Sequence, residues 1–145
     1  MADKNYIFTK GKRKEAVARV RLYKDLKETL TAGTLTVKKG DIFINDLPVD
    51  KYFSGLVAKA YFEEPLKITN NLGKYTITAR VEGGGNQSQL GAFIHGVSKA
   101  LSQIDEKNKQ ILRKKGFLTR DPRVRQRRKV GMGGKARRKK QSPKR

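Results

Sequence analysis

The 145-residue sequence contains no cysteine and only one histidine, His95. A disulfide framework, a thiol nucleophile and a zinc site built from Cys and His are therefore excluded. The longest stretch without an Asp, Glu, Lys or Arg covers residues 83–98 and is rich in glycine and amide side chains, so no membrane-spanning helix is expected. The first residues lack the apolar run of a secretory signal, which predicts a cytosolic protein.

Acidic residues are also scarce. Thirteen Asp and Glu stand against 35 Lys and Arg, which leaves a net charge of +22. A chain with this excess repels itself and predicts a polyanionic partner, either nucleic acid or an anionic membrane surface. A helix lying on a membrane needs a wide apolar face, which the basic segments lack, so nucleic acid is favoured.

The positive charge is concentrated at the C-terminal end. Residues 112–145 hold sixteen Lys and Arg and one acidic residue, whereas residues 1–111 hold nineteen and twelve. Beyond Leu118 there are too few apolar residues to offset the backbone entropy of folding, about 1–2 kcal/mol per residue. We therefore expect a folded domain over residues 1–118 and an extended cationic tail over residues 119–145.

Alternating apolar residues predict strands in the folded part. Between residues 15 and 23, Ala16, Ala18, Val20 and Leu22 share one face, and the other face is cationic. Further strands are expected over residues 5–10, 35–37, 42–45 and 74–81. A basic turn over residues 11–14 joins the first two strands, and residues 39–41 have the composition of a hairpin turn.

Two segments have the spacing of helices. Residues 49–62 place Tyr52, Phe53, Leu56, Val57 and Ala60 together, and Pro65 is expected to end this helix. Residues 88–104 carry an apolar stripe with Ser88 or Asn86 as the cap. This order of elements predicts an α+β, two-layer fold, in which a mixed sheet of four to five strands supports two main helices.

Possible catalytic features have simpler structural explanations. The Gly83–Gly85 segment could cradle phosphate, but it also suits a strand-to-helix turn with positive φ angles. We expect His95 to be a partly buried, hydrogen-bonded residue or an RNA contact. The acidic pairs at residues 63–64 and 105–106 are expected to be solvated, because neighbours on a helix do not face each other. The sequence predicts no catalytic residue, no metal site and no cofactor.

The basic segments are the candidate RNA-binding residues. Four of the five residues from Lys10 to Lys14 are cations, and two arginines continue along one face of the next strand. In the tail, glycines between the basic runs let the backbone approach phosphates closely. The candidates are Lys10, Lys12, Arg13, Lys14, Arg19, Arg21, Gly83, Gly84, Gly85, Arg113, Lys114, Arg120, Arg123, Arg125, Arg127, Arg128, Lys129, Lys135, Arg137, Arg138, Lys139 and Lys140.

Several of these segments also resemble a known family, the bacterial-type small-subunit ribosomal protein nine. The resemblance is carried by residues 11–22, by Ile42–Asn45 with Tyr52-Phe53, by residues 83–101 and by residues 112–124, together with residues 135–138 and the Lys144-Arg145 end. It implies a fold like the second domain of ribosomal protein five of the same subunit, with a left-handed strand–helix–strand crossover, an exception to the usual hand.

The resemblance also implies a function, that of a structural, non-enzymatic component of the small ribosomal subunit in the cytoplasm. The folded domain would bind the 3′ major domain of the rRNA in the subunit head, beside other head proteins. The tail would reach the peptidyl (P) site, where Lys144 and Arg145 would contact tRNA phosphates. No membrane and no small-molecule substrate are implied.

Two alternatives remain at this point. A DNA-compacting basic protein would share the charge, but it would need a dimer or a helix rich in cations. A small-molecule phosphotransferase would share the fold class and a glycine-rich loop, but it would need a nucleotide pocket and carboxylates to hold Mg²⁺.

Overall fold

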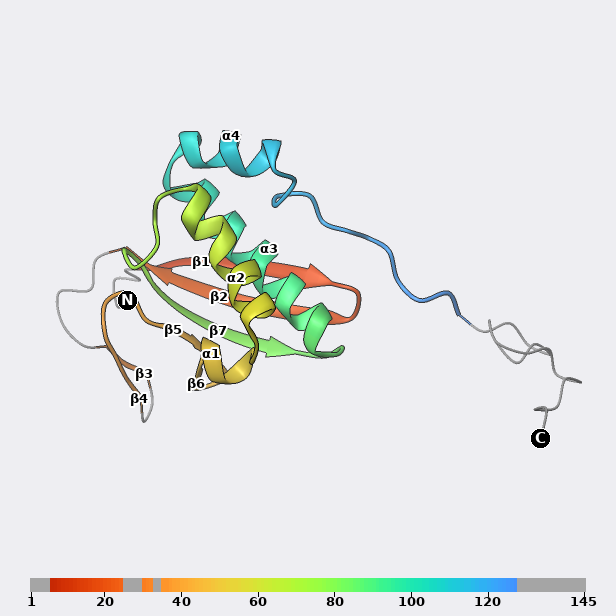
Figure 1. The fold of residues 1–145 in the computed structure, drawn as a ribbon, viewed down its shortest axis with the longest axis horizontal. Coiled ribbons are helices and arrows are strands. Elements are labelled where there is room, and N and C mark those ends of the chain that lie inside the picture. The colour runs from red at the N-terminus through yellow and green to blue at the C-terminus, as the bar shows by residue number, and fades with distance from the viewer. Residues whose placement is uncertain (1–5, 25–29, 33–34, 128–145) are drawn as a thin grey trace, which may run out of the picture.

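A five-stranded mixed sheet forms the centre of the protein (Figure 1). The computed structural model describes residues 6–24, 30–32 and 35–127. The sheet has the order β1-β2-β7-β5-β6, in which only β5 and β7 are parallel neighbours, while β3 and β4 pair separately. The elements are β1 (Tyr6–Arg13), β2 (Ala16–Tyr23), β3 (Leu30–Ala32), β4 (Leu35–Val37), β5 (Ile42–Ile44), β6 (Leu47–Pro48), α1 (Val49–Tyr52), α2 (Leu56–Ile68), β7 (Thr76–Glu82), α3 (Asn86–Ile104) and α4 (Glu106–Lys114). The predicted α+β class and mixed sheet are confirmed.

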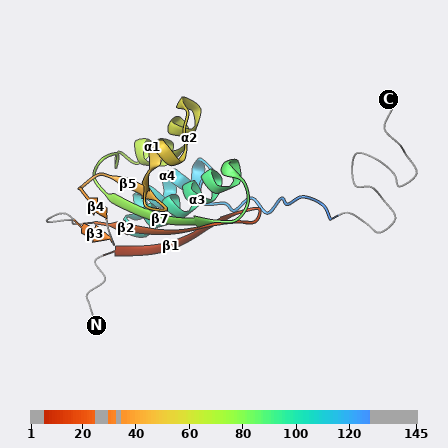
Figure 2. The same cartoon turned by 90° about the horizontal axis from the view of Figure 1, so that it is seen from below.

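The helices lie on one face of the sheet, as Figure 2 shows edge-on. Ala16, Ala18, Val20 and Leu22 of β2 point toward them and are fully buried, which confirms the predicted alternation. The helices leave the opposite face of β1, β2 and β7 uncovered. In the described ranges, no helix combines the length and the apolar character needed to cross a membrane.

Helix α3 lies against β1 at glycine contacts. A Cβ atom at Gly11 would be 2.0 Å from the carbonyl oxygen of Ala92 and 2.5 Å from the amide nitrogen of Gly96. The Thr9 hydroxyl donates a 2.8 Å hydrogen bond to the Gly96 carbonyl beside this contact. The predicted basic turn is accordingly shorter, because residues 11–13 continue β1 and only Lys14 and Glu15 form the turn.

The helix predicted over residues 49–62 has the wrong bounds. It is divided into α1 and α2 around Gly55, whose φ of +112° is one that glycine favours. Of the predicted stripe Phe53 is buried, but Leu56 is 87% exposed and Val57 70% exposed. Pro65 does not end α2, which continues to Ile68, since the helix buries Pro65 with Phe62 and Leu66 and the burial offsets the missing N–H bond.

The turn at residues 39–41 does not form a hairpin. Strand β4 pairs with β3, whereas β5 leaves the turn to pair with β7 in parallel. The local pattern predicts a turn, and the Asp41 N–H does donate to the Lys38 carbonyl at 3.2 Å. Which strands pair is decided by contacts distant in sequence.

Helix α4 was not predicted, and two smaller expectations also need correction. Asp105 begins α4, with its carboxylate accepting from the Lys107 N–H at 3.0 Å, so it is an N-cap and is exposed as expected. Helix α3 begins after Gly85 rather than with a cap from Ser88 or Asn86. Glu63, expected to be solvated, pairs with Lys67 at 2.8 Å and is only 17% exposed.

Candidate nucleic-acid interface

Three cations form a row across the open face of the sheet. Lys10 of β1 is the direct partner of Arg19 in β2, and Arg19 is the direct partner of Arg80 in β7. Because neighbouring strands lie about 4.8 Å apart, the row of Lys10, Arg19 and Arg80 places the Cα atoms of three cations within about 10 Å. We call these residues the cation row.

Like charges directly opposite each other destabilise a sheet. Within the described residues, an ion pair between Arg19 and Glu82 offsets part of this repulsion. All three cations of the row are exposed, so hydration of their charged ends is retained. A surface that keeps such repulsion in the free protein is suited to a polyanion, whose phosphates would relieve it.

Most of the sheet residues in this surface were predicted. Arg19 and Arg21 are exposed on the face that the alternation predicted. Lys10 and Lys12, expected at the end of the first strand and in the basic turn, are exposed on the same open face of β1. Arg80 was missed as a binding candidate although it alternates with the buried residues of β7. The missing information was the strand order, which places β7 beside β2.

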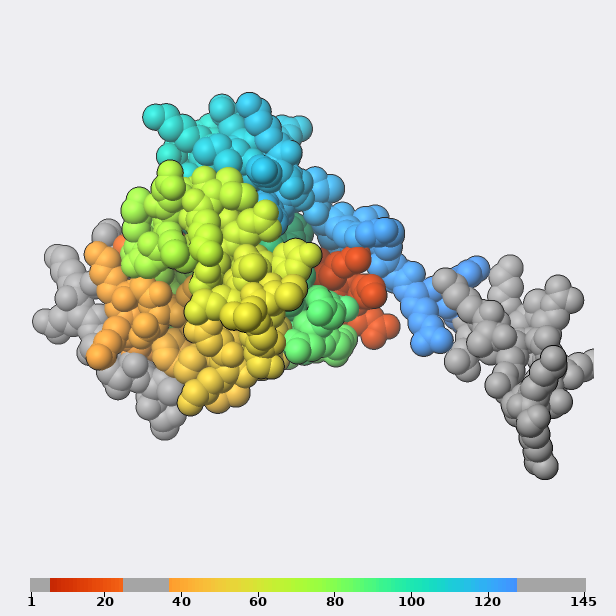
Figure 3. All heavy atoms as spheres, viewed as in Figure 1, coloured from red at the N-terminus to blue at the C-terminus, as the bar shows by residue number. Residues whose placement is uncertain are grey.

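The start of the C-terminal segment is held beside the β1–β2 turn. The Arg13 Nη1 atom lies 2.6 Å from Oδ1 of Asp121 and also donates to the Asp121 carbonyl at 3.3 Å. The same carboxylate accepts from the Arg123 backbone N–H at 2.9 Å and pairs with its guanidinium at 2.7 Å. Figures 1 and 3 show the segment, in blue, leaving the domain beside this turn.

Asp121 therefore fixes where the chain leaves the domain. The hydrogen bonds from the Arg123 side chain and backbone, and then the one from Arg13, hold the pKa of the Asp121 carboxyl well below its usual range. A depressed pKa stabilises the attachment fully above the ordinary carboxyl pKa of about 4, and the effect is lost only as the pH falls through the lowered value. We expect no change in the attachment between pH 5 and 8.

Replacing Asp121 by asparagine is expected to release this segment at every pH, because Asn cannot pair ionically with either arginine. The amide of Arg123 should exchange faster in Asp121→Asn than in the parent protein, so its protection factor, measured by NMR, should fall. Asp50→Asn, which removes an exposed carboxylate near α2, is the control. Equal protection in Asp121→Asn and the parent would contradict this role for Asp121.

The Gly83–Gly85 segment has the conformation expected of a strand-to-helix turn. Gly83 and Gly84 have φ angles of +75° and +62°. A Cβ atom at Gly83 would be 2.7 Å from the Glu15 carbonyl oxygen, so the segment also packs closely on the β1–β2 turn. The basic turn and the glycine segment, two of the predicted binding elements, therefore lie side by side.

A side-chain network missed by the sequence analysis supports the glycine segment. Asn45 bonds to both the N–H and the carbonyl of Val81, each at 2.9 Å, and donates to the Tyr52 hydroxyl at 3.2 Å. That hydroxyl donates to Gln89 at 2.9 Å, and Gln89 donates to the Gly83 carbonyl at 3.2 Å. Asn45 has a φ of +47°, a backbone conformation that Asn tolerates. This residue type at this position is the one local feature that could have pointed to the network.

His95 is partly buried and hydrogen-bonded, as one of its two interpretations predicted. Its Nδ1 atom accepts from the Lys12 N–H at 3.4 Å. Burial, and then the charge of Lys99, lower the His95 pKa, so the imidazole is neutral at pH 7 and can act as this acceptor.

The other predicted cations lie in two places. Arg113 and Lys114 are exposed on α4, in the helical layer. Arg120, Arg123, Arg125 and Arg127 are exposed in residues 120–127, which form neither helix nor strand. Outside the described residues lie Arg128, Lys129, Lys135, Arg137, Arg138, Lys139, Lys140, Lys144 and Arg145.

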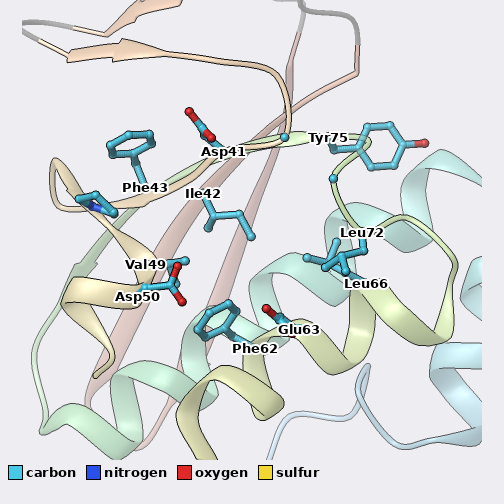
Figure 4. Close-up of a pocket in the computed structure, with 13 residues that line it drawn as sticks. Asp41, Ile42, Phe43, Val49, Asp50, Phe62, Glu63, Leu66, Leu72 and Tyr75 are labelled. Carbon is cyan, nitrogen blue, oxygen red and sulfur yellow. The ribbon is translucent and has the colours of Figure 1, made fainter. Parts of the chain in front are cut away.

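A hollow of about 460 Å³ lies elsewhere, between β5, α1 and α2 (Figure 4). Phe43 and Phe62 contribute apolar walls, and the charged residues lining it are Asp41, Asp50 and Glu63. These carboxylates repel phosphate, and the Gly83–Gly85 segment does not line the hollow. Across the part of the chain that the structure describes, no group of three or more His, Asp or Glu side chains could hold a metal ion.

Comparison with known proteins gives one family by two routes, a family model and a curated relative. The family described as "Ribosomal protein S9/S16" matches residues 11–145. The small ribosomal subunit protein uS9 of Maridesulfovibrio salexigens is 40% identical to this chain over 132 residues, which cover 91% of this chain and 92% of that protein. Residues 11–145 include Arg19 and Arg80 of the cation row and the C-terminal cations, whereas Lys10 precedes the matched range.

Proposed function

The chain belongs to the ribosomal protein S9/S16 family, and on this premise we propose how it binds RNA and what its C-terminal end contacts. As a family member it is an RNA-binding structural protein of the small ribosomal subunit, which takes part in translation in the cytoplasm. The proposed function is that the open sheet face and the β1–β2 turn hold rRNA of the subunit head, while the C-terminal end extends to tRNA in the P site.

The cation row is the observation that carries the rRNA part of this proposal. Lys10, Arg19 and Arg80 face one another, and among the described residues only Arg19 has an acidic partner, Glu82, so repulsion remains that RNA phosphates would relieve. The Gly83–Gly85 segment lies beside the β1–β2 turn at the end of the sheet. Arg13 points to the helical side there, where it lies near Gly91 of α3 and pairs with Asp121. Family membership favours RNA as the polyanion over the DNA-compacting alternative.

Replacing Arg80 by threonine tests this use of the row. Because a like-charge contact is removed and Thr suits a strand, the free energy of unfolding should rise by about 0.2–1 kcal/mol. Binding to rRNA should nevertheless weaken, and the slope of log K against log salt should become shallower by about 0.7–0.9. Chemical denaturation and a salt titration of rRNA binding measure the two effects.

Lys109→Gln is the matched control, since it removes one positive charge from α4 on the helical side. It should change the salt slope less than Arg80→Thr does. Equal slopes for the two variants would show that net charge, rather than the cation row, controls binding.

The tRNA part of the proposal concerns Lys144 and Arg145. It rests on family resemblance and on the chemistry of the two side chains. An arginine guanidinium can bind a phosphate through two hydrogen bonds, and lysine adds a point charge.

Replacing both Lys144 and Arg145 by glutamine is expected to weaken P-site tRNA binding to reconstituted small subunits by about tenfold, because charge-assisted hydrogen bonds are lost. Assembly of the subunit should be nearly unchanged. The matched control is the double change Lys139→Gln and Lys140→Gln, which removes the same charge farther from the end. If the control weakened tRNA binding as much, the terminal pair would have no special role.

The proposal also covers where the folded domain ends and the hand of one connection in the sheet. We place the boundary between the folded domain and the cationic tail at residues 118–119. We also expect the β5–α2–β7 connection to be left-handed, like that of the second domain of ribosomal protein five of the same subunit.

A further inference from the structure

The open face carries aromatic rings as well as charge. Phe8 of β1 is the direct partner of Arg21 in β2, and Tyr6 is the direct partner of Tyr23. We call these four residues the aromatic patch. It occupies the two rows next to the cation row, because successive residues on one face of a strand lie two positions apart.

The patch is already stacked in the free protein. The Tyr6 and Tyr23 rings lie 5.5 Å apart with planes tilted by 54°, and the Arg21 guanidinium carbon lies 5.3 Å from the centre of the Tyr6 ring. These contacts fix the planar groups before any ligand arrives, which lowers the entropy cost of binding.

Within the ranges that the structure describes, Phe8 makes no aromatic or cation–π contact comparable to that of Tyr6. It is 53% exposed and its strand neighbours on this face include Lys10, so it does not belong to the apolar core. An exposed phenylalanine between cations contributes little to the stability of the fold. Its ring offers a flat apolar surface beside groups that attract anions.

One side of the patch is closed. The Tyr6–Tyr23 row continues to Thr76, which is buried. The Thr76 hydroxyl donates to the Lys38 carbonyl and accepts from the Gly40 N–H, both at 3.1 Å, so residues 38–40 lie over this end of the row. The accessible direction therefore runs from Phe8 toward the cation row.

We propose that the aromatic patch stacks an unpaired base of a single-stranded RNA segment, with Phe8 as the principal stacking residue and the cation row holding the adjacent phosphates. Aromatic and guanidinium planes bind exposed base faces, whereas a double helix conceals those faces. The positive charge around the patch favours RNA over a protein partner. This inference rests on the proposed RNA-binding function and adds the form of RNA that the sheet face accepts.

The test uses the full chain and a twelve-nucleotide single-stranded RNA with 2-aminopurine at its centre. Stacking on Phe8 should quench the 2-aminopurine fluorescence. Phe8→Leu keeps an apolar side chain but removes the aromatic face, so the affinity should fall about 5- to 100-fold and the quenching should be lost. The salt slope should not change, because no charge is removed, and Phe8→Tyr should restore both readouts.

Tyr61→Leu is the matched control, because Tyr61 on α2 is 54% exposed but lies in the helical layer. Thermal unfolding of each variant checks the fold, and a duplex RNA of the same length should bind Phe8→Leu and the parent equally.

Two results would overturn the stacking proposal while leaving the proposed function intact. In one, Phe8→Leu binds and quenches like the parent although Arg80→Thr still weakens binding, as expected if the patch receives a protein. In the other, Phe8→Leu weakens single-stranded and duplex RNA equally. If no RNA bound with a salt-dependent affinity, the proposed function itself would fail.

Discussion

Replacing Gly11 with alanine is expected to lower the thermal unfolding midpoint by about 10 °C, the equivalent of roughly 3 kcal/mol in a chain of this size. The new Cβ atom would lie 2.0 Å from the Ala92 carbonyl oxygen and 2.5 Å from the Gly96 amide nitrogen. Both are backbone atoms of α3, so no side-chain rotation can relieve the overlap. Helix α3 would have to move away from β1.

That movement would also break contacts beside the glycine. The Thr9 hydroxyl would lose the Gly96 carbonyl, and the Lys99 ammonium would lose the Lys10 carbonyl to which it donates at 3.2 Å. RNA binding should weaken as well, because β1 supplies part of the cation row.

Gly85→Ala is the control for this experiment. Gly85 has an ordinary φ of −107°, and a Cβ atom there would meet nothing within 4 Å. At a helix N-cap Gly is preferred over Ala, so the change should cost about 0.5–1 kcal/mol, well below the effect expected at Gly11. Unfolding midpoints for Gly11→Ala and Gly85→Ala that agreed within 2 °C or so would be incompatible with close α3–β1 packing.

Removal of residues 128–145 is expected to produce the largest loss of RNA affinity. The segment contains nine Lys and Arg and no acidic residue. If all nine contact phosphates, the slope of log K against log salt becomes shallower by about 6–8 when they are removed. At moderate salt the affinity for rRNA should fall by about a thousandfold or more.

A chain in which residues 128–145 are scrambled separates charge from sequence. Phosphate contacts carry little sequence information, so the scrambled chain should bind rRNA with nearly the parent affinity and slope. It should still fail to support P-site tRNA binding if the order of residues at the end matters. An unchanged salt slope after the truncation would mean that the C-terminal cations do not contact RNA.

The sequence predicted best those features that depend on local periodicity. The alternation in β2 identified its buried and cationic faces correctly, because burial on one face imposes a period of two. The stripe of α3 was predicted for the same reason, with Val97 and Leu101 fully buried or nearly so. The α+β class followed from the order of these elements.

Features decided by distant contacts were not predictable in this way. The apolar spacing around Leu56 suggested one helix, but the positive φ at Gly55 divides it and turns Leu56 toward solvent. The sequence showed Arg80 on an exposed strand face, yet the cation row exists only because β7 lies beside β2. The Arg13–Asp121 ion pair likewise joins residues 108 positions apart.

The most direct test of the proposed RNA-binding surface is a density map of the small ribosomal subunit that contains this chain. Lys10, Arg19 and Arg80 should face the rRNA backbone, and residues 128–145 should run among RNA segments with residue 145 near P-site tRNA. A map in which the open sheet face meets protein or solvent, and residues 128–145 lie outside the RNA, would contradict both parts of the proposed function.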